Sequence, residues 1–315
     1  MSDIRVFAGR ASESFAALMC ERLGVPLSDT RLQRFANDCL EVQLMDNCRE
    51  RDVYLVQSIA APVQEHLVEL LLMIDAARGA SASRITVVMP HFAYARSDKK
   101  DAPRISVGGP LVADLLATAG ADRVLTMTLH APQVQSFFRM PTDQLHALRE
   151  LADHFSGEDH SNTTVVSPDL GNAKSATAFA RRIGARVAAG AKERFEDDRV
   201  VITSLIGDVA GRDIIVLDDE IANGSTVIAI LEHLRNAGAG RVRVVCTHGI
   251  FSNGALDRIG AAEEVDEIVT TDTVPRQGKD HPKLSVLNVA PAFAEAVRRI
   301  HSGDSVSALF GPTAL

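Results

Sequence analysis

The sequence predicts an α/β protein of two tandem domains, each built on a mainly parallel sheet flanked by helices. Short apolar runs of strand length alternate with stretches of helical length, and the pattern recurs in the second half of the chain. Strands that alternate with helices in this way form parallel sheets that are covered on both faces. The expected strands are 53–56, 85–89, 124–127, 165–166, 214–217, 242–246 and 268–269.

The clearest helix is expected from Pro62 to Arg78, before Gly79. Proline suits a first helical turn because its missing N–H has no partner there in any case. The apolar positions Leu67, Leu70, Leu71, Ile74 and Ala77 fall on one helical face. We therefore expect this helix to cover a sheet.

An internal repeat indicates the domain organisation. Residues 82–91 resemble residues 239–248, and residues 51–56 resemble residues 212–217 at nearly the same separation. A repeat of about half the chain predicts duplicated domains rather than a short-period solenoid. We expect an N-terminal domain over 1–146 and a C-terminal domain over 147–315, with the last segment packing back on the N-terminal domain.

Charge and composition exclude several function classes. The net charge is −8 and no basic block occurs, which disfavours nucleic acid and anionic membrane surfaces as partners. The longest apolar run, 70–74, is far shorter than the ~20 residues that cross a bilayer. The four cysteines have no C-x-x-C spacing, so we expect reduced thiols and a cytoplasmic protein.

The segment 214–226 (Ile-Ile-Val-Leu-Asp-Asp-Glu-Ile-Ala-Asn-Gly-Ser-Thr) carries the strongest chemical pattern. A buried strand is expected to end in Asp218 and Asp219. Gly224 then permits unusual backbone angles in a short turn, and Ser225 and Thr226 are expected to open a helix. Ligands of parallel sheets bind beyond the carboxyl ends of the strands, and free amides at a helix start suit a phosphate. The pattern fits a phosphosugar site, and equally an acidic turn with a helix cap.

This segment resembles the phosphoribosyl-diphosphate loop of the type I phosphoribosyltransferase fold. Other segments are similar to ribose-phosphate pyrophosphokinases (PRPP synthases), in the same order from about residue 5 to residue 310. These segments are 34–37, 56–58, 94–100, 129–131, 166–171, 206–209, 247–252 and 294–300. The resemblance implies two type I phosphoribosyltransferase-like domains. It also implies a magnesium-dependent enzyme that moves the β,γ-diphosphoryl group of ATP to the 1-hydroxyl of ribose 5-phosphate, giving PRPP and AMP.

The resemblance assigns roles to individual residues. Ribose 5-phosphate would be bound by Asp218, Asp219, Ala222, Asn223, Gly224, Ser225 and Thr226. ATP would contact Phe35, Asn37, Arg96, Ser97, Asp98 and His130, and Mg²⁺ would be held by His130 and Asp169. Lys192 and Arg194 would be the catalytic cations of a loop that closes over the diphosphate.

Several of these residues have a plainer interpretation. Phe35 is of a type usually found in a core, and His130 would otherwise be a satisfied histidine at a strand end. Without the resemblance, Asp169 belongs to an ordinary Ser-Pro-Asp turn, and Lys192 and Arg194 belong to a solvated charged hairpin.

The chain departs from the family pattern Asp-Asp-x-x-Asp-Thr-Gly/Cys-Gly-Thr at three positions of the loop. Ala222 replaces the third acid, Asn223 the threonine and Ser225 the second glycine. Ala222 removes a carboxylate contact to the ribose. Cys39 and Ser97 stand where the family has an adenine-binding Glu and a Gln.

Two alternatives share these features. A regulatory homologue without activity, or with weak activity, would tolerate the departures at Ala222 and Cys39. A salvage phosphoribosyltransferase would share the 218–226 loop but not the first half of the chain. The resemblance further implies a homo-oligomer built from dimers, up to a hexamer.

Overall fold

The structure is a computed structural model that describes residues 3–194 and 200–309, without the side chains of 192–194, 200–203 and 308. The chain separates into two compact units. Unit 1 contains residues 1–146, 273–275 and 289–315, and unit 2 contains residues 147–272 and 276–288. Each unit has its own sheet.

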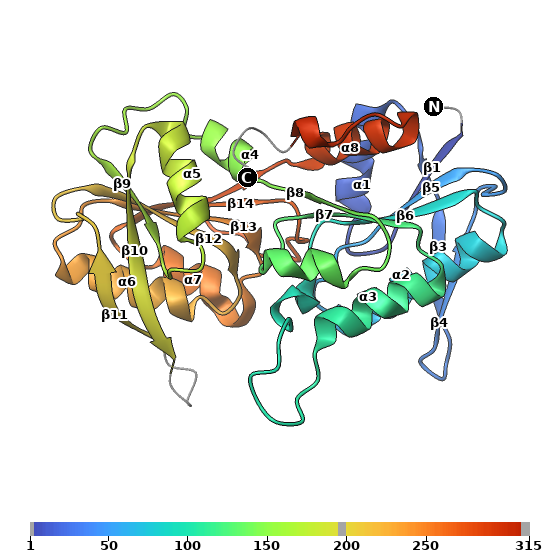
Figure 1. Cartoon of the computed structure of the whole chain (residues 1–315), viewed down its shortest axis with the longest axis horizontal. Coiled ribbons are helices and arrows are strands. Elements are labelled where there is room, and N and C mark those ends of the chain that lie inside the picture. Colours follow the sequence, from blue (N-terminus) through green and yellow to red (C-terminus); the bar gives the residue numbers. More distant parts are fainter. Residues whose placement is uncertain (1–2, 195–199, 310–315) are drawn as a thin grey trace. The chain divides into compact units, whose positions relative to one another are not determined.

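Unit 1 contains a six-stranded parallel sheet in the order β2-β1-β5-β6-β7-β8 (Figure 1). Its strands are β1 (Ile4–Ala8), β2 (Leu27–Ser28), β5 (Asp52–Val56), β6 (Arg84–Met89), β7 (Arg123–Met127) and β8 (Thr142–Leu145). Its helices are α1 (Glu13–Leu23), α2 (Val63–Gly79), α3 (Gly108–Ala119) and α8 (Ala290–Ser302). A separate antiparallel hairpin is formed by β3 (Thr30–Arg34) and β4 (Leu40–Leu44).

Unit 2 contains a seven-stranded sheet in the order β11-β10-β9-β12-β13-β14-β15, in which β10 and β11 pair antiparallel. Its strands are β9 (Thr163–Ser167), β10 (Arg186–Arg194), β11 (Val200–Ile206), β12 (Asp213–Ile221), β13 (Val242–Gly249), β14 (Val265–Thr271) and β15 (Leu284–Leu287). Its helices are α4 (Leu148–Asp153), α5 (Ala173–Ile183), α6 (Ser225–Asn236) and α7 (Ala255–Gly260).

The two sheets share one connectivity. The parallel order β1-β5-β6-β7-β8 of unit 1 corresponds to β9-β12-β13-β14-β15 of unit 2, with α1, α2 and α3 in the places of α5, α6 and α7. The repeat at 51–56 and 212–217 therefore marks equivalent strands, β5 and β12. The α/β prediction with mainly parallel sheets is confirmed, and each expected strand lies within an observed strand.

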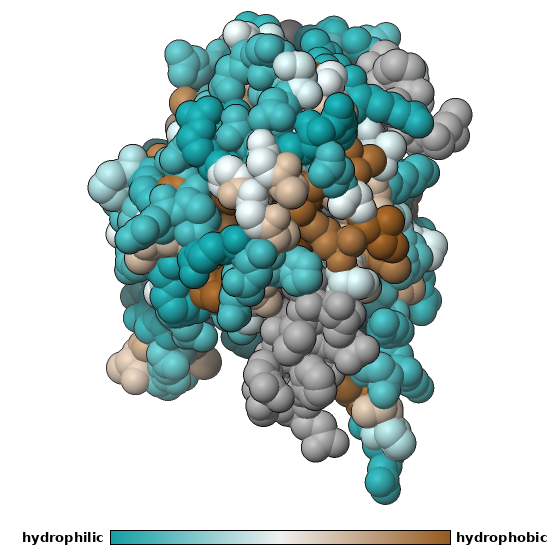
Figure 2. All heavy atoms as spheres, turned by 90° about the vertical axis from the view of Figure 1, so that its left-hand side faces the viewer, coloured by the Kyte–Doolittle hydropathy of each residue, from teal (hydrophilic) through white to brown (hydrophobic). Residues whose placement is uncertain are grey.

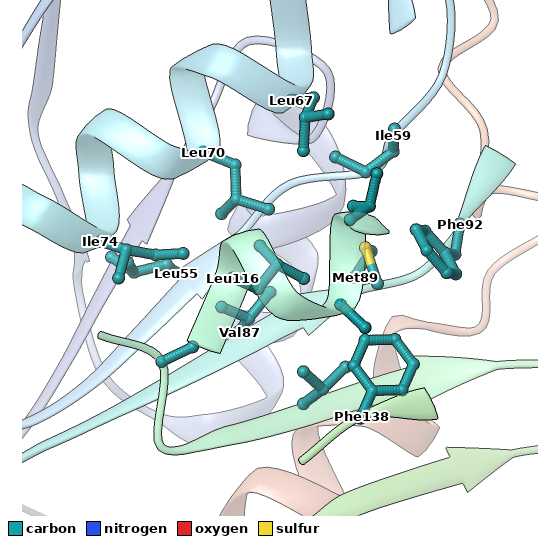
Figure 3. Packing of buried hydrophobic residues seen from close by; sticks show 14 of the residues in the cluster. Leu55, Ile59, Leu67, Leu70, Ile74, Val87, Met89, Phe92, Leu116 and Phe138 are labelled. Atoms are coloured by element: carbon teal, nitrogen blue, oxygen red, sulfur yellow. The ribbon is translucent and has the colours of Figure 1, made fainter. Parts of the chain in front are cut away.

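The core of unit 1 forms where helices α2 and α3 meet the sheet. The expected apolar face of the 62–78 segment is correct, because Leu70, Ile74 and Ala77 are fully buried. Figure 3 shows Leu70 and Ile74 beside Leu55 and Val87 of the sheet, with Leu116 of α3. Apolar strand faces and a helical stripe bury each other here, which is the main source of stability for such a layer.

Helix α8 belongs to unit 1 although it comes near the end of the chain. Phe293 of α8 packs edge-on against Phe15 of α1, with ring centroids 5.2 Å apart. At the other end of the helix, the His301 ring lies 2.8 Å from a carboxylate oxygen of Asp52. Burial alone would raise the pKa of Asp52, but hydrogen bonds from Arg84, His301 and Tyr54 lower it below its ordinary value.

The face of the molecule drawn in Figure 2 is mainly hydrophilic. On the face drawn in Figure 2, hydrophobic side chains gather in one area among polar ones. The large apolar side chains exposed on unit 2 are Leu170, Val187, Ile206 and Ile228. Among the described residues, no helix is long and apolar enough to span a bilayer.

All four cysteines are free, and only Cys39, on the hairpin of β3 and β4, is exposed. Burial raises the pKa of Cys20 and of Cys246 to about 12, and it also raises the pKa of Cys48. A buried thiol of raised pKa supplies little of the reactive thiolate at pH 8.

We expect one thiol per folded chain to react rapidly with a disulfide reagent at pH 8, and three more to react after unfolding in guanidinium. The readout is the absorbance of released thiolate with time. The Cys39→Ser variant should lose the fast reaction alone. A second fast thiol in that variant would contradict the burial of the other three.

Candidate functional site

The loop between β12 and α6 lies at the carboxyl edge of the sheet in unit 2. Strand β12 does not end at Leu217 as expected, because pairing with β13 continues to Ile221. Asp218 and Asp219 therefore lie within the last residues of the strand and are half-buried. Glu220 between them and the loop is buried, with 7% of its surface exposed.

Three carboxylates concentrate negative charge at this edge. Burial raises the pKa of Asp218 well above its ordinary value, and the nearby carboxylates of Asp219 and Asp169 raise it further. One compensating contact is the Asp219 amide, which donates to Oδ1 of Asp218 at 2.9 Å. An acidic group held in this way is typical of a binding or catalytic site, because a fold alone has no need of it.

Asp169 enters this group from the end of β9, the strand next to β12. The Asn172 amide donates to Oδ1 of Asp169 at 3.1 Å, and the Asn172 side chain donates to the carbonyl of Leu217 at 3.1 Å. Asn172 thus ties the loop after β9 to strand β12. The sequence analysis did not single it out, although an asparagine directly before a helix is a recognisable start signal.

A helix start follows the acids. Gly224 has φ +75°, and a Cβ there would lie 3.1 Å from that of Ala255, so glycine is required both by conformation and by space. Oδ1 of Asn223 accepts from the Ser225 amide at 3.1 Å and from its hydroxyl at 2.9 Å. Within the described residues, the amides of Gly224 and Thr226 have no acceptor. Such amides suit an anion.

In unit 1, four of the six expected ATP residues follow strands β6 and β7: Arg96, Ser97, Asp98 and His130. Nε2 of Gln133 donates to a carboxylate oxygen of Asp98 at 2.8 Å, which links the segment after β6 to the one after His130. No sequence signal pointed to Gln133. His130 is exposed, and Thr128 before it has φ +42°. A β-branched residue in that region is strained, and such strain gathers at functional sites.

Arg96 and Ser97 lie at the short 3-10 turn η1 (Ala93–Arg96) and directly after it. Arg96 is exposed. The Ser97 hydroxyl accepts from the Gly108 amide at 2.7 Å, and its carbonyl accepts from the Gly109 amide at 2.9 Å. Ser97 therefore fixes this loop to the start of α3, which positions Arg96.

Phe35 and Asn37 form the tip of the β3–β4 hairpin. The interpretation of Phe35 as a core residue is wrong, because 42% of its surface is exposed. Oδ1 of Asn37 accepts from the Cys39 amide at 3.3 Å, and Asp38 has φ +71°. The turn therefore presents an aromatic ring to solvent, where it is available to a ligand or a second chain.

Lys192 and Arg194 lie near the end of β10, opposite Ile202 and Val200 of β11. The expected hairpin is therefore present. Residues 195–199, and the side chains of Lys192 and Arg194, lie outside the described part of the structure.

The site residues fall into two groups. Asp169, Asp218, Asp219 and the 222–226 loop lie together in unit 2, whereas Phe35, Asn37, Arg96, Ser97, Asp98 and His130 belong to unit 1. In the described ranges no three metal-ligating side chains converge on one point.

Known proteins match both halves of the chain. Residues 4–120 match the model of the N-terminal domain of ribose phosphate pyrophosphokinase, and residues 198–311 match that of the phosphoribosyl synthetase-associated domain. A Deinococcus radiodurans protein named ribose-phosphate pyrophosphokinase is 47% identical over 315 residues, covering 98% of each chain. The chain belongs to the ribose-phosphate pyrophosphokinase family.

Two further similarities cover nearly the whole chain. A Streptomyces coelicolor protein, named provisionally as a ribose-phosphate pyrophosphokinase, is 68% identical over 311 residues, 98% of each chain. The crystal structure of phosphoribosylpyrophosphate synthetase from Mycobacterium smegmatis matches with a TM-score of 0.89 and 35% identity, over 96% of this chain and 99% of that one. The family resemblance and its two-domain fold are confirmed, and the regulatory alternative is not favoured.

The acidic group generates a prediction about stability. Because the folded-state pKa of Asp218 is above the unfolded value, its ionised form destabilises the fold at neutral pH. Asp218→Asn should therefore raise the melting temperature at pH 7.5, by roughly 2–4 °C if the relief is about 1 kcal/mol. The gain should shrink as the pH falls through the raised pKa.

The same variant should bind ribose 5-phosphate at least about tenfold more weakly in a calorimetric titration, because a charged acceptor is lost. Asp266→Asn, a carboxylate on β14 paired with Arg241 at 3.7 Å, is the matched control and should show neither effect. A lower melting temperature for Asp218→Asn would contradict the assigned repulsion.

Proposed function

We propose that the chain transfers the β,γ-diphosphoryl group of ATP to the 1-hydroxyl of ribose 5-phosphate, giving PRPP and AMP. The observation that carries the proposal is the edge of unit 2, where two strand-end carboxylates precede a helix start whose Gly224 and Thr226 amides have no acceptor among the described residues, in a chain of the ribose-phosphate pyrophosphokinase family. Carboxylates accept from sugar hydroxyls, and amides donate to phosphate. This pairing matches the two ends of a sugar phosphate.

Ribose 5-phosphate is bound by the 218–226 loop. Asp218 and Asp219 accept hydrogen bonds from the ribose hydroxyls. Asn223, Gly224, Ser225 and Thr226 hold the 5-phosphate at the start of α6, where the helix dipole also favours negative charge. Ala222 contributes its backbone and no carboxylate, so the loop contacts the ribose through one acid fewer than the family pattern provides.

ATP is bound by residues of unit 1. Arg96 supplies a cation, and the contact between Asp98 and Gln133 positions the segment after His130, which contacts the phosphates. Ser97 contributes indirectly to ATP binding, because its hydroxyl accepts from the Gly108 amide and so fixes the loop that carries Arg96 to the start of α3. The exposed ring of Phe35 stacks on the adenine of a neighbouring chain, with Asn37 beside it, so the active form is a homo-oligomer built from dimers.

Magnesium accompanies ATP. Mg²⁺ prefers oxygen ligands and usually keeps several waters while it binds one or two carboxylates and substrate phosphates. Asp169 fits this role, because it adds charge to a group whose carboxylates already repel one another. His130 contacts the phosphates or the metal. When bound, the ion neutralises charge on the transferring diphosphate.

Lys192 and Arg194 are the catalytic cations. The attack of the ribose hydroxyl on the β-phosphorus spreads negative charge over the diphosphoryl oxygens, and paired cations stabilise that charge most strongly where water is excluded. They are positioned at the end of a hairpin, which allows them to approach after both substrates are bound. Their contribution therefore falls on the transition state.

The domain roles and the location of the protein follow from these assignments. Unit 1, which combines residues 1–146 with 273–275 and 289–315, carries the nucleotide and subunit contacts, and unit 2 carries the ribose 5-phosphate loop. The four free cysteines and the ATP substrate support a cytoplasmic location.

Product identity tests the function. The purified chain is incubated with ATP, Mg²⁺ and ribose 5-phosphate, and the products are resolved by phosphorus NMR and by nucleotide chromatography. We expect AMP and PRPP in equal amounts. ADP would indicate an ordinary kinase, and the absence of product would support the regulatory alternative.

The closing cations are tested by Lys192→Ala. We expect turnover to fall about 100-fold or more, while ribose 5-phosphate affinity stays within twofold, because a transition-state contact changes kcat and not ground-state binding. Lys283→Ala, which removes a lysine bound to the Ala262 carbonyl, is the control. A loss in turnover of less than about tenfold would rule out this role for Lys192.

A further inference from the structure

Three consecutive backbone carbonyls of the sugar-phosphate loop are held by one neighbouring segment, residues 250–258. The carbonyl of Ile221 accepts from the amides of Ile250 and Phe251, both at 3.0 Å. The carbonyl of Ala222 accepts from the Ser252 amide at 2.9 Å. We call residues 250–258 the bracket, because three consecutive loop residues, 221–223, are bound to it.

The third carbonyl is bound by a side chain. One terminal nitrogen of Arg258, on α7, donates to the carbonyl of Asn223 at 2.6 Å. Its other terminal nitrogen donates to the carbonyl of Asn253, within the bracket itself. A single planar guanidinium therefore joins the loop after β12 to the turn after β13. Two parallel donors on a rigid plane are a property of arginine that lysine lacks.

The bracket has a backbone that needs such support. Phe251 and Asn253 have φ of +45° and +54°, and Gly254 follows at +69°. Left-handed residues other than glycine cost free energy and persist only where surrounding contacts fix them. Lys279, which lies outside the bracket, also supports it: its Nζ donates to the carbonyl of Ile250 at 2.6 Å.

The orientation of the carbonyls decides where the amides point. Since the carbonyls of 221–223 are directed at the bracket, the peptide planes of the loop are fixed. The amides of Gly224 and Thr226 remain without an acceptor in the described part of the chain. The Gly224 amide shares a peptide plane with the Asn223 carbonyl, so the contact from Arg258 fixes its direction and leaves it able to donate to an anion.

We propose that Arg258 is a positioning residue for the sugar phosphate: by holding the carbonyls of Asn223 and Asn253, it aims the Gly224 amide at the 5-phosphate. This inference rests on the proposed role of that loop in binding ribose 5-phosphate. Because Arg258 acts only on main-chain groups of the sugar-phosphate loop, substitutions of Arg258 should leave the KM for ATP unchanged.

The test uses Arg258→Met and Arg258→Lys in the full chain, with Arg235→Met as the matched control. Arg235 is also an exposed arginine of unit 2, and it pairs with Glu264 at 2.7 Å, away from the loop. Ribose 5-phosphate affinity is measured by calorimetry without ATP, and KM for each substrate is measured by AMP release.

We expect Arg258→Met to weaken ribose 5-phosphate binding about tenfold and to raise its KM equally, with the KM for ATP and the kcat within twofold of the parent. The melting temperature should match that of Arg235→Met. Arg258→Lys should be nearly as weak as Arg258→Met, because one ammonium cannot occupy both carbonyls at the same geometry.

Three results would overturn the inference. An unchanged affinity in Arg258→Met would show that the bracket does not depend on Arg258. Full recovery in Arg258→Lys would assign the residue a direct charge contact with the phosphate instead. A parent protein that binds no ribose 5-phosphate would remove the role of the loop itself. By contrast, a parent that binds ribose 5-phosphate but releases no AMP would refute only the proposed reaction.

Discussion

The concentration of carboxylates at the carboxyl edge of unit 2 is the constraint on which the rest of the site depends. Asp218, Asp219 and Asp169 repel one another in a partly desolvated position, and the pKa of Asp218 is raised in consequence. A fold accepts such a group only where stronger packing surrounds it. Strand β12 supplies that packing, because Ile214, Ile215 and Val216 are almost fully buried beneath the acids.

The duplicated architecture explains why only one unit carries this group. Both sheets present the carboxyl ends of parallel strands at one edge, which is where such folds bind ligands. At the equivalent strand ends, β5 is followed by Gln57 and Ser58, both buried, whereas β12 carries its acids. In unit 1 the Ser58 hydroxyl instead donates to the carbonyl of Thr273 at 2.6 Å. This edge of the sheet therefore makes an internal structural contact in unit 1, whereas in unit 2 it carries the acidic group.

Much of the fold was predictable because it follows from periodicity and burial. The strands at 53–56 and 85–89 and the helix after Pro62 required only apolar patterns and a proline. The end of β12 was wrong by several residues, since a strand can carry acids when its neighbour β13 continues to pair with it. For Phe35 the residue type alone favours a core position, but the ring is exposed because a hairpin tip has no layer above it to cover a ring.

The site was predictable only in part, for a physical reason. Side chains that touch a ligand follow a local pattern, and the acids at 218 and 219 could be recognised from that pattern. Residues that act through backbone carbonyls leave no such trace. Arg258 lies 35 positions from Asn223, and the contact exists only because β12 and β13 are neighbours in the sheet. The contact of Arg258 with Asn223 can therefore be identified from the tertiary structure and not from the spacing of residues in the sequence.

The departures within the loop are consistent with the charge that the site already holds. A carboxylate at 222 would add repulsion beside Asp218, whereas Ala222 adds none. Asn223 then supplies a neutral oxygen that accepts from both the amide and the hydroxyl of Ser225. A phosphate dianion forms stronger, charge-assisted hydrogen bonds than an amide oxygen does. A phosphate at this helix start would therefore compete with Asn223 for the amide and the hydroxyl of Ser225.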